Sequence, residues 1–110
     1  MNWKEHERRT ARRLGGERVA VADRRSDADV LHPLLSIECK HRKKLPAWLF
    51  DAVGQAAAAH NDKIPVAVLH QLGQNSDKDL CVVPMIFFER LTKAFEDLRH
   101  LEATRPELFD

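Results

Sequence analysis

Asp29, Glu38 and Lys40 are the residues whose types and spacing point most clearly to chemistry. The aspartate is followed nine positions later by a Glu-x-Lys triplet inside a predicted strand. Successive side chains of a strand point to opposite faces, so we expect Glu38 and Lys40 on one face and Ile37 and Cys39 on the other. The pattern therefore predicts a carboxylate and an amine side by side, with a second carboxylate within reach.

A hairpin with its turn at His32-Pro33 would bring Asp29 alongside Glu38. Two adjacent carboxylates repel each other unless a cation lies between them, and carboxylate oxygens are the hard ligands that suit Mg²⁺ or Mn²⁺. Lys40 can then orient or activate a water, or stabilise charge that builds on a phosphate. The alternative is an ordinary solvated ion pair, since Glu-x-Lys triplets are common in strands.

The composition predicts one compact domain over residues 1–110, because 44% of them are hydrophobic. No apolar run has membrane-spanning length, and the charged N-terminal residues lack the apolar region of a secretion signal. Cys39 and Cys81 show no Cys-x-x-Cys spacing, which favours reduced thiols in a cytoplasmic protein. A zinc site built from Cys39, His41, His32 and Cys81 is a weaker alternative, because no second closely spaced ligand pair exists.

The charge of the chain is unevenly distributed. Residues 1–44 carry twelve Lys and Arg against seven Asp and Glu, a net charge of +5, whereas residues 45–110 have a net charge of −4. A basic half that contains the candidate carboxylates favours a polyanionic partner such as DNA over scattered surface charge. The side chains that we expect to contact DNA are Arg8, Arg12, Arg24, Arg25, Ser26, Arg42, Lys43, Lys44 and Gln55, and the Arg and Lys among them are expected to contact phosphates.

Apolar periodicity and glycine or proline signals give the expected elements, and Gly15-Gly16 is expected to end the first helix as a C-terminal cap. A helix between the third and fourth predicted strands suggests a crossover connection and a mixed sheet. The sequence therefore predicts an α/β fold in which a mixed five-stranded sheet is flanked by helices. The predicted helices cover residues 2–14, 46–60 and 85–102, and the predicted strands cover 18–22, 29–32, 34–42, 64–70 and 79–83.

Two polar side chains on the first two predicted helices have open roles. Glu7 lies on the stripe of the first helix that should pack inward, with Trp3, Thr10 and Leu14. A buried carboxylate is costly unless it is paired or bound to a metal, so Glu7 either reaches an arginine or is a third acidic member of the site. Gln55, on the alanine-rich second helix, is either a surface glutamine or faces the edge of the sheet that bears the site.

The last predicted helix has a wide apolar surface for a chain of this size. Phe88, Leu91, Phe95 and Leu98 form one stripe at helical spacing. This surface either packs over the sheet of its own chain or contacts a second subunit.

The motif Ala28-Asp29 with Glu38-Cys39-Lys40 resembles that of the PD-(D/E)xK nuclease superfamily, with alanine in place of the usual proline. Within the superfamily, residues 3–85 look most like the archaeal-type and phage Holliday junction resolvases. The resemblance implies a restriction-endonuclease-like arrangement of the predicted sheet. The other matching pieces are Glu7-Arg8, Leu14-Gly15, Arg25-Ser26 and Ile64-Pro-Val-Ala-Val68.

The resemblance also implies roles for individual residues. Asp29 and Glu38 would bind the metal together with the backbone carbonyl of Cys39. Lys40 would position or activate the attacking water, and Glu7 would be a further acidic ligand or an orienting group. Members of the superfamily hydrolyse phosphodiester bonds and leave a 5′-phosphate and a 3′-hydroxyl.

As a whole, the resemblance implies a Mg²⁺- or Mn²⁺-dependent endonuclease that acts on four-way DNA junctions as a homodimer, in the host cytoplasm if a phage encodes it. Gln55 matches a glutamine that some members carry in the following helix, without a settled role. One alternative is a repair or restriction-type nuclease acting on nicks, flaps or duplex DNA. Another is a non-catalytic DNA-binding module of the same fold, against which the intact Asp29, Glu38 and Lys40 argue.

Overall fold

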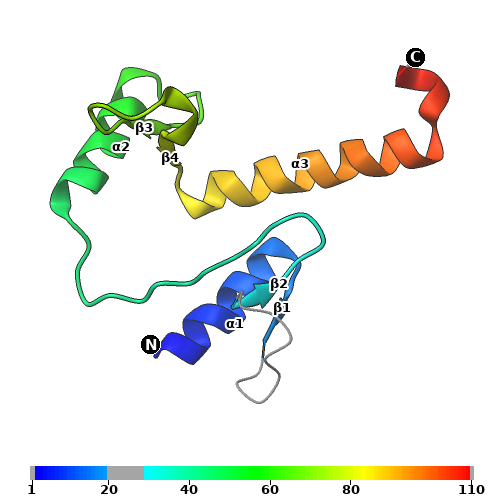
Figure 1. Ribbon diagram of the computed structural model, residues 1–110, viewed down its shortest axis with the longest axis horizontal. Coiled ribbons are helices and arrows are strands. Elements are labelled where there is room, and N and C mark those ends of the chain that lie inside the picture. Colours follow the sequence, from blue (N-terminus) through cyan, green and yellow to red (C-terminus); the bar gives the residue numbers. More distant parts are fainter. Residues whose placement is uncertain (1, 20–28, 110) are drawn as a thin grey trace. The chain divides into compact units, whose positions relative to one another are not determined.

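The structure is a computed structural model that describes residues 2–19 and 29–109 (Figure 1). The chain divides into two compact units, Met1–Lys43 and Lys44–Asp110. The expectation of one domain stays a prediction. The first unit holds α1 (Trp3–Leu14), β1 (Glu17–Arg18) and β2 (Val30–Leu31).

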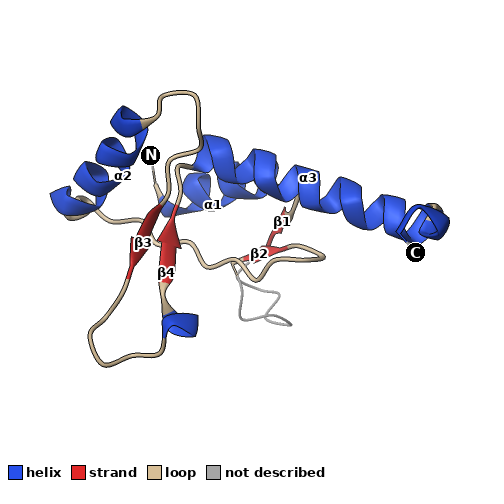
Figure 2. Ribbon diagram, turned by 90° about the horizontal axis from the view of Figure 1, so that it is seen from above, coloured by secondary structure: helices blue, strands red, loops and turns tan. Residues whose placement is uncertain are grey.

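The second unit holds α2 (Ala47–Ala59), β3 (Ala67–Leu69), β4 (Leu80–Val82) and α3 (Met85–Thr104) (Figure 2). It also has two short 3₁₀ helices, η1 (Ser76–Lys78) and η2 (Pro106–Phe109).

The first helix, α1, is capped at both ends by its own sequence. The Asn2 side chain accepts a hydrogen bond from the Glu5 backbone N–H at 2.9 Å, which satisfies one of the free donors of the first turn. Gly15 ends the helix with a φ of 72°, and the Gly16 N–H donates to the Ala11 carbonyl at 2.8 Å. A left-handed glycine followed by such a bond is a common helix end. The predicted first helix and its glycine cap are confirmed.

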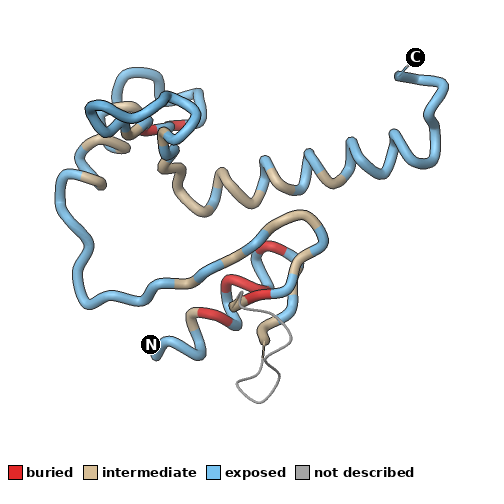
Figure 3. The backbone as a smooth tube through the Cα atoms, in the orientation of Figure 1, coloured by how far each residue is buried: buried red, intermediate tan, exposed pale blue. Residues whose placement is uncertain are grey.

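The first unit packs α1 against a two-stranded antiparallel sheet. In this sheet Glu17 lies opposite Leu31 and Arg18 lies opposite Val30. Val30 is fully buried, and the buried positions cluster along one side of α1 and at β2 (Figure 3). The stripe predicted for the first helix is therefore buried, apart from Trp3, which is 48% exposed. Its buried members are Glu7, Thr10, Ala11 and Leu14.

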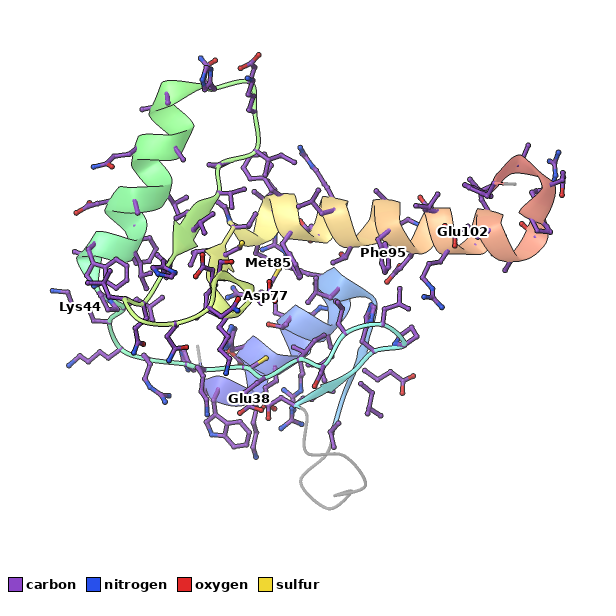
Figure 4. All side chains as sticks on the ribbon, turned by 45° about the horizontal axis from the view of Figure 1, so that its top comes forward. Glu38, Lys44, Asp77, Met85, Phe95 and Glu102 are labelled. Atoms are coloured by element: carbon purple, nitrogen blue, oxygen red, sulfur yellow. The ribbon has the colours of Figure 1, made fainter. Side chains whose placement is uncertain are left out.

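The second unit pairs β3 with β4 in an antiparallel hairpin and packs α2 against β3. The predicted helices over 46–60 and 85–102 are confirmed within two residues by α2 and α3. Several large apolar side chains of α3 are exposed, including Phe95 near the middle of the helix (Figure 4). None of the helices in residues 2–19 and 29–109 combines the length and the apolar character that crossing a membrane requires.

The predicted five-stranded mixed sheet is wrong. The described strands form two separate antiparallel pairs, β1 with β2 and β3 with β4, and each strand has only two or three residues. The predicted strand over 34–42 is reduced to one isolated bridge between Ile37 and Val30. An alternating pattern of side chains predicts which face each residue occupies, but it does not predict which strand, if any, will hydrogen-bond to the segment. Each short strand has instead paired with its neighbour in sequence.

The glycine pair after α1 gives a stability prediction, because the two glycines are needed for different reasons. A Cβ on Gly16 would collide with the Leu31 carbonyl oxygen and lie 2.8 Å from Cγ1 of Val30. A Cβ on Gly15 meets no described atom within 4 Å, so Gly15→Ala should destabilise the protein only through the positive φ of this residue, by about 1–2 kcal/mol. We expect Gly16→Ala to lower the free energy of unfolding more than Gly15→Ala in chemical denaturation. Equal losses would contradict the close packing of α1 on β2.

Candidate functional site

One pocket of the first unit brings together the four residues that the sequence marked as candidate catalytic groups. Glu7, Asp29, Glu38 and Lys40 all line it, and its volume is about 330 Å³. The side chains come from α1, from the residue before β2 and from the extended segment that follows β2, on which Glu38 is labelled in Figure 4. The other lining residues are Trp3, His6, Cys39, His41 and Arg42.

Asp29 holds three segments of this unit together. Its backbone N–H donates to the Ile37 carbonyl at 2.9 Å, and its carbonyl accepts from the Val19 N–H at 3.1 Å. One carboxylate oxygen, Oδ2, accepts from the Cys39 backbone N–H at 2.6 Å. These bonds set Asp29 against the residues on either side of Glu38, as the predicted hairpin requires.

Glu38 and Lys40 share the open side of the pocket. Both are exposed, whereas Ile37 and Cys39 are half-buried, so burial alternates along the segment as predicted although no strand ladder forms. The Lys40 Nζ lies 3.2 Å from Oε1 of Glu38. Exposed pairs of this kind contribute only about 0–1 kcal/mol, so another cation or a phosphate can replace either partner at little cost.

Glu7 fits both roles that the sequence left open, because it pairs with an arginine and also lies with the other acidic residues of the site. It is buried on α1 and its Oε2 accepts a hydrogen bond from Nε of Arg18 at 2.7 Å, and it also lines the pocket. Sequence reasoning did not identify Arg18 as the partner. The available signal was the glycine pair after α1, which turns the chain back so that β1 runs beside the helix.

Burial raises the pKa of the Cys39 thiol above its usual range. A hydrogen bond with Thr10 opposes this shift, and the negative charges of Asp29, Glu7 and Glu38 add to it. Without a bound ion, the thiol is therefore protonated at neutral pH.

The alternative zinc site gains no support from the described residues of the first unit, because Nδ1 of His32 already accepts the backbone N–H groups of Leu34 and Leu35 at 3.0 and 3.1 Å. Within the described ranges, no three His, Cys, Asp or Glu side chains converge in a ready-made metal site of any kind.

The predicted DNA-contacting residues fall into three groups. Arg42 lines the pocket, and Arg8, Arg12 and Lys43 are exposed on the same unit. Lys44 and Gln55 are exposed residues of the second unit and are not among those that line the pocket. Arg24, Arg25 and Ser26 lie outside the described residues.

Three aromatic residues of the pocket have contacts that sequence reasoning did not predict. Trp3 lies under two cations, with Nζ of Lys4 5.5 Å and Cζ of Arg18 5.6 Å from its ring. The rings of His6 and His41 have centroids 5.5 Å apart and are tilted by 44°. Each histidine could have been noticed from the sequence because it adjoins a candidate residue. His6 precedes Glu7 in the helix, and His41 follows Lys40 in the extended segment.

Comparison of the chain with known protein families, with curated proteins and with solved structures found no match. The similarity to PD-(D/E)xK nucleases therefore stays an interpretation of the motif. Any assignment of function depends on the pocket and on the charges around it.

The Glu7–Arg18 pair gives a second stability prediction. Arg18→Met leaves the Glu7 carboxylate buried without its hydrogen bond, and we expect it to lower the free energy of unfolding by about 1–3 kcal/mol. Glu7→Gln keeps an oxygen that can accept from Arg18, so its cost should be smaller. Thermal or urea denaturation measures both. A loss in Arg18→Met no greater than that of Arg9→Met, at an exposed position of α1, would show that the pair contributes nothing.

Proposed function

We propose that this chain is a metal-dependent DNA endonuclease of the PD-(D/E)xK type. The observation that carries the proposal is the pocket in which Glu7, Asp29, Glu38 and Lys40 meet, although 33 positions of sequence separate the first from the last. Three carboxylates and an amine around a solvent-accessible hollow are the groups that phosphodiester hydrolysis needs. A carboxylate set binds the ion, and a nearby amine stabilises charge on the phosphate.

The donor groups fit Mg²⁺ or Mn²⁺. Asp29 uses one carboxylate oxygen for the Cys39 N–H, which leaves the other for a ligand. The resemblance to PD-(D/E)xK nucleases adds the backbone carbonyl of Cys39 as a further donor. Glu38 is exposed, so its side chain can turn toward Asp29 when an ion neutralises their repulsion. When bound, such an ion supplies Lewis acidity to the water and to the phosphate.

Lys40 supplies an exposed positive charge beside the acidic members. Its ammonium group contacts Glu38 at 3.2 Å and is mostly exposed, so it is free to move to a phosphate oxygen or to hold the attacking water. Arg42 also lines the pocket and adds a second cation that can bind the phosphate backbone.

The charge distribution supports DNA as the substrate. The residues up to Lys44 have a net charge of +5, and the exposed Arg8, Arg12 and Lys43 belong to the unit that contains the pocket. Phosphate contacts by such side chains release counterions and make binding weaken as salt rises. An acidic substrate is therefore attracted to the half of the chain that would cleave it.

Within this function, we propose that the active species is a homodimer that prefers four-way junctions. A resolvase cuts two symmetry-related strands, and a two-fold dimer supplies two sites in that relation. The exposed apolar face of α3 offers the contact surface. Leu91, Phe95, Leu98 and Leu101 on this helix are between 42% and 50% exposed.

We expect Asp29→Asn, Glu38→Gln and Lys40→Met each to lower the rate of DNA cleavage at least about a hundredfold, because each removes a group that stabilises the transition state. The assay uses four-way, flap, nicked and plain duplex DNA with Mg²⁺, and excess chelator should abolish cleavage. Glu17→Gln, an exposed carboxylate of β1, is the matched control and should keep full activity. Full activity in any of the three pocket variants would remove that residue from the mechanism.

We expect Phe95→Glu to convert the dimer to a monomer, because it places a charge in the centre of the apolar face of α3. Light scattering at micromolar concentration measures the mass, and competition between junction and duplex measures the preference. His100→Glu, at an exposed position on the opposite face of α3, is the control and should stay dimeric. A monomeric wild-type chain that binds both DNAs equally would favour a general repair nuclease instead.

A further inference from the structure

One buried nitrogen on a residue that lines the pocket has no hydrogen-bond partner, although every carboxylate of the pocket has one. The three carboxylates each accept a hydrogen bond or face a cation at 2.6 to 3.2 Å. By contrast, Nδ1 of His6 is shielded from solvent and has no hydrogen-bond partner in the described part of the chain. Buried polar atoms without a partner are rare, so this nitrogen calls for an explanation. A bound ligand is one.

The second histidine of the pocket lies at the distance that a shared ligand requires. Two imidazoles that bind one metal ion have ring centroids roughly 5 Å apart, because each metal–nitrogen bond is about 2.0–2.1 Å long. The centroids of His6 and His41 are 5.5 Å apart. An aromatic contact gives a similar separation, but it leaves the buried nitrogen of His6 without a partner.

Glu38 is the carboxylate best placed to complete such a site. Asp29 has one oxygen bound to the Cys39 N–H, and its other oxygen is the one that the nuclease proposal assigns to Mg²⁺, whereas Glu7 is held by Arg18 in a mostly buried pair. Glu38 is exposed and contacts only the exposed Lys40 among the pairs described for it. No three-ligand group is preformed in the described residues, so the third ligand arrives by rotation of the Glu38 side chain, which gives up only a weak ion pair.

We propose that the pocket takes a divalent transition ion such as Co²⁺ or Zn²⁺ through the imidazoles of His6 and His41 and the carboxylate of Glu38. Imidazole nitrogen suits these ions, whereas Mg²⁺ and Mn²⁺ suit oxygen donors. For its role in catalysis the proposal rests on the nuclease function, with Glu38 turned toward the two imidazoles instead of toward Asp29. Binding of the ion can be measured without DNA.

The experiment is a Co²⁺ titration of the full, metal-stripped chain, followed by visible absorption. Wild-type protein should develop absorption bands of a nitrogen-containing site. His6→Phe and His41→Phe keep an aromatic ring but remove the nitrogens, and each should weaken Co²⁺ binding at least tenfold. Losing a residue that only supports a metal ligand already weakens metal affinity about tenfold or more, so losing a ligand itself should cost at least as much. His60→Phe, at an exposed histidine outside the pocket lining, should bind as the wild type does.

Two comparisons separate this inference from the nuclease proposal. His6→Phe should leave Mg²⁺ affinity within about twofold of wild type, because Mg²⁺ needs no imidazole, whereas Asp29→Asn should weaken it. Circular dichroism checks folding, and His6→Gln replaces His6→Phe if the latter unfolds. Unchanged Co²⁺ affinity in the folded His6 variant overturns the inference even if DNA is cleaved. Loss of Co²⁺ binding in both histidine variants supports it even if the wild-type chain cleaves no DNA.

Discussion

The hydrogen bonds of Asp29 are the constraint on which the first unit depends. Its N–H, its carbonyl and its carboxylate bind the backbones of Ile37, Val19 and Cys39, so one residue ties β2 to the segments before and after it. A bridge of a single residue pair, Val30 with Ile37, is all the strand pairing that the following segment has. Without the carboxylate bond to Cys39, little in the described structure would keep Glu38 and Lys40 at the pocket.

The two ion pairs of the pocket differ in how easily they open. The Glu7 and Arg18 side chains are 11% and 17% exposed, and breaking their bond would leave a charge in a poorly solvated place. The Glu38 and Lys40 side chains are 54% and 64% exposed, and water can replace either partner. The buried pair therefore fixes the wall of the pocket, and the exposed pair is the part that can rearrange around an ion or a phosphate.

The sequence predicted the local features of this chain well and its sheet poorly. The cap at Gly15 and the inward stripe of α1 follow from interactions among neighbours in sequence, which periodicity and residue type encode. The alternation of Glu38 and Lys40 with Ile37 and Cys39 was likewise predicted and is seen in their burial. Strand pairing depends on distant partners, and a period of two residues carries no information about which partner is present.

The same distinction explains what was found and what was missed in the candidate site. Asp29, Glu38 and Lys40 form a motif that can be recognised from the sequence alone. Arg18 and the His6–His41 contact exist only because α1 packs on β1 and because the extended segment returns past the helix. No spacing rule relates residue 6 to residue 41, so these contacts become visible only in the folded structure.

Asp29 also shows why structure and chemistry must be separated at this site. Asp29→Ala would remove both the proposed metal ligand and the acceptor for the Cys39 N–H, so loss of activity would have two explanations. Asp29→Asn keeps one oxygen that can accept this N–H and replaces the other with an NH₂ group, so it removes the negative charge and one oxygen that could bind an ion. A folded, inactive Asn variant therefore assigns the effect to the carboxylate's role at the site, and an unfolded one assigns it to the three segments that Asp29 holds together.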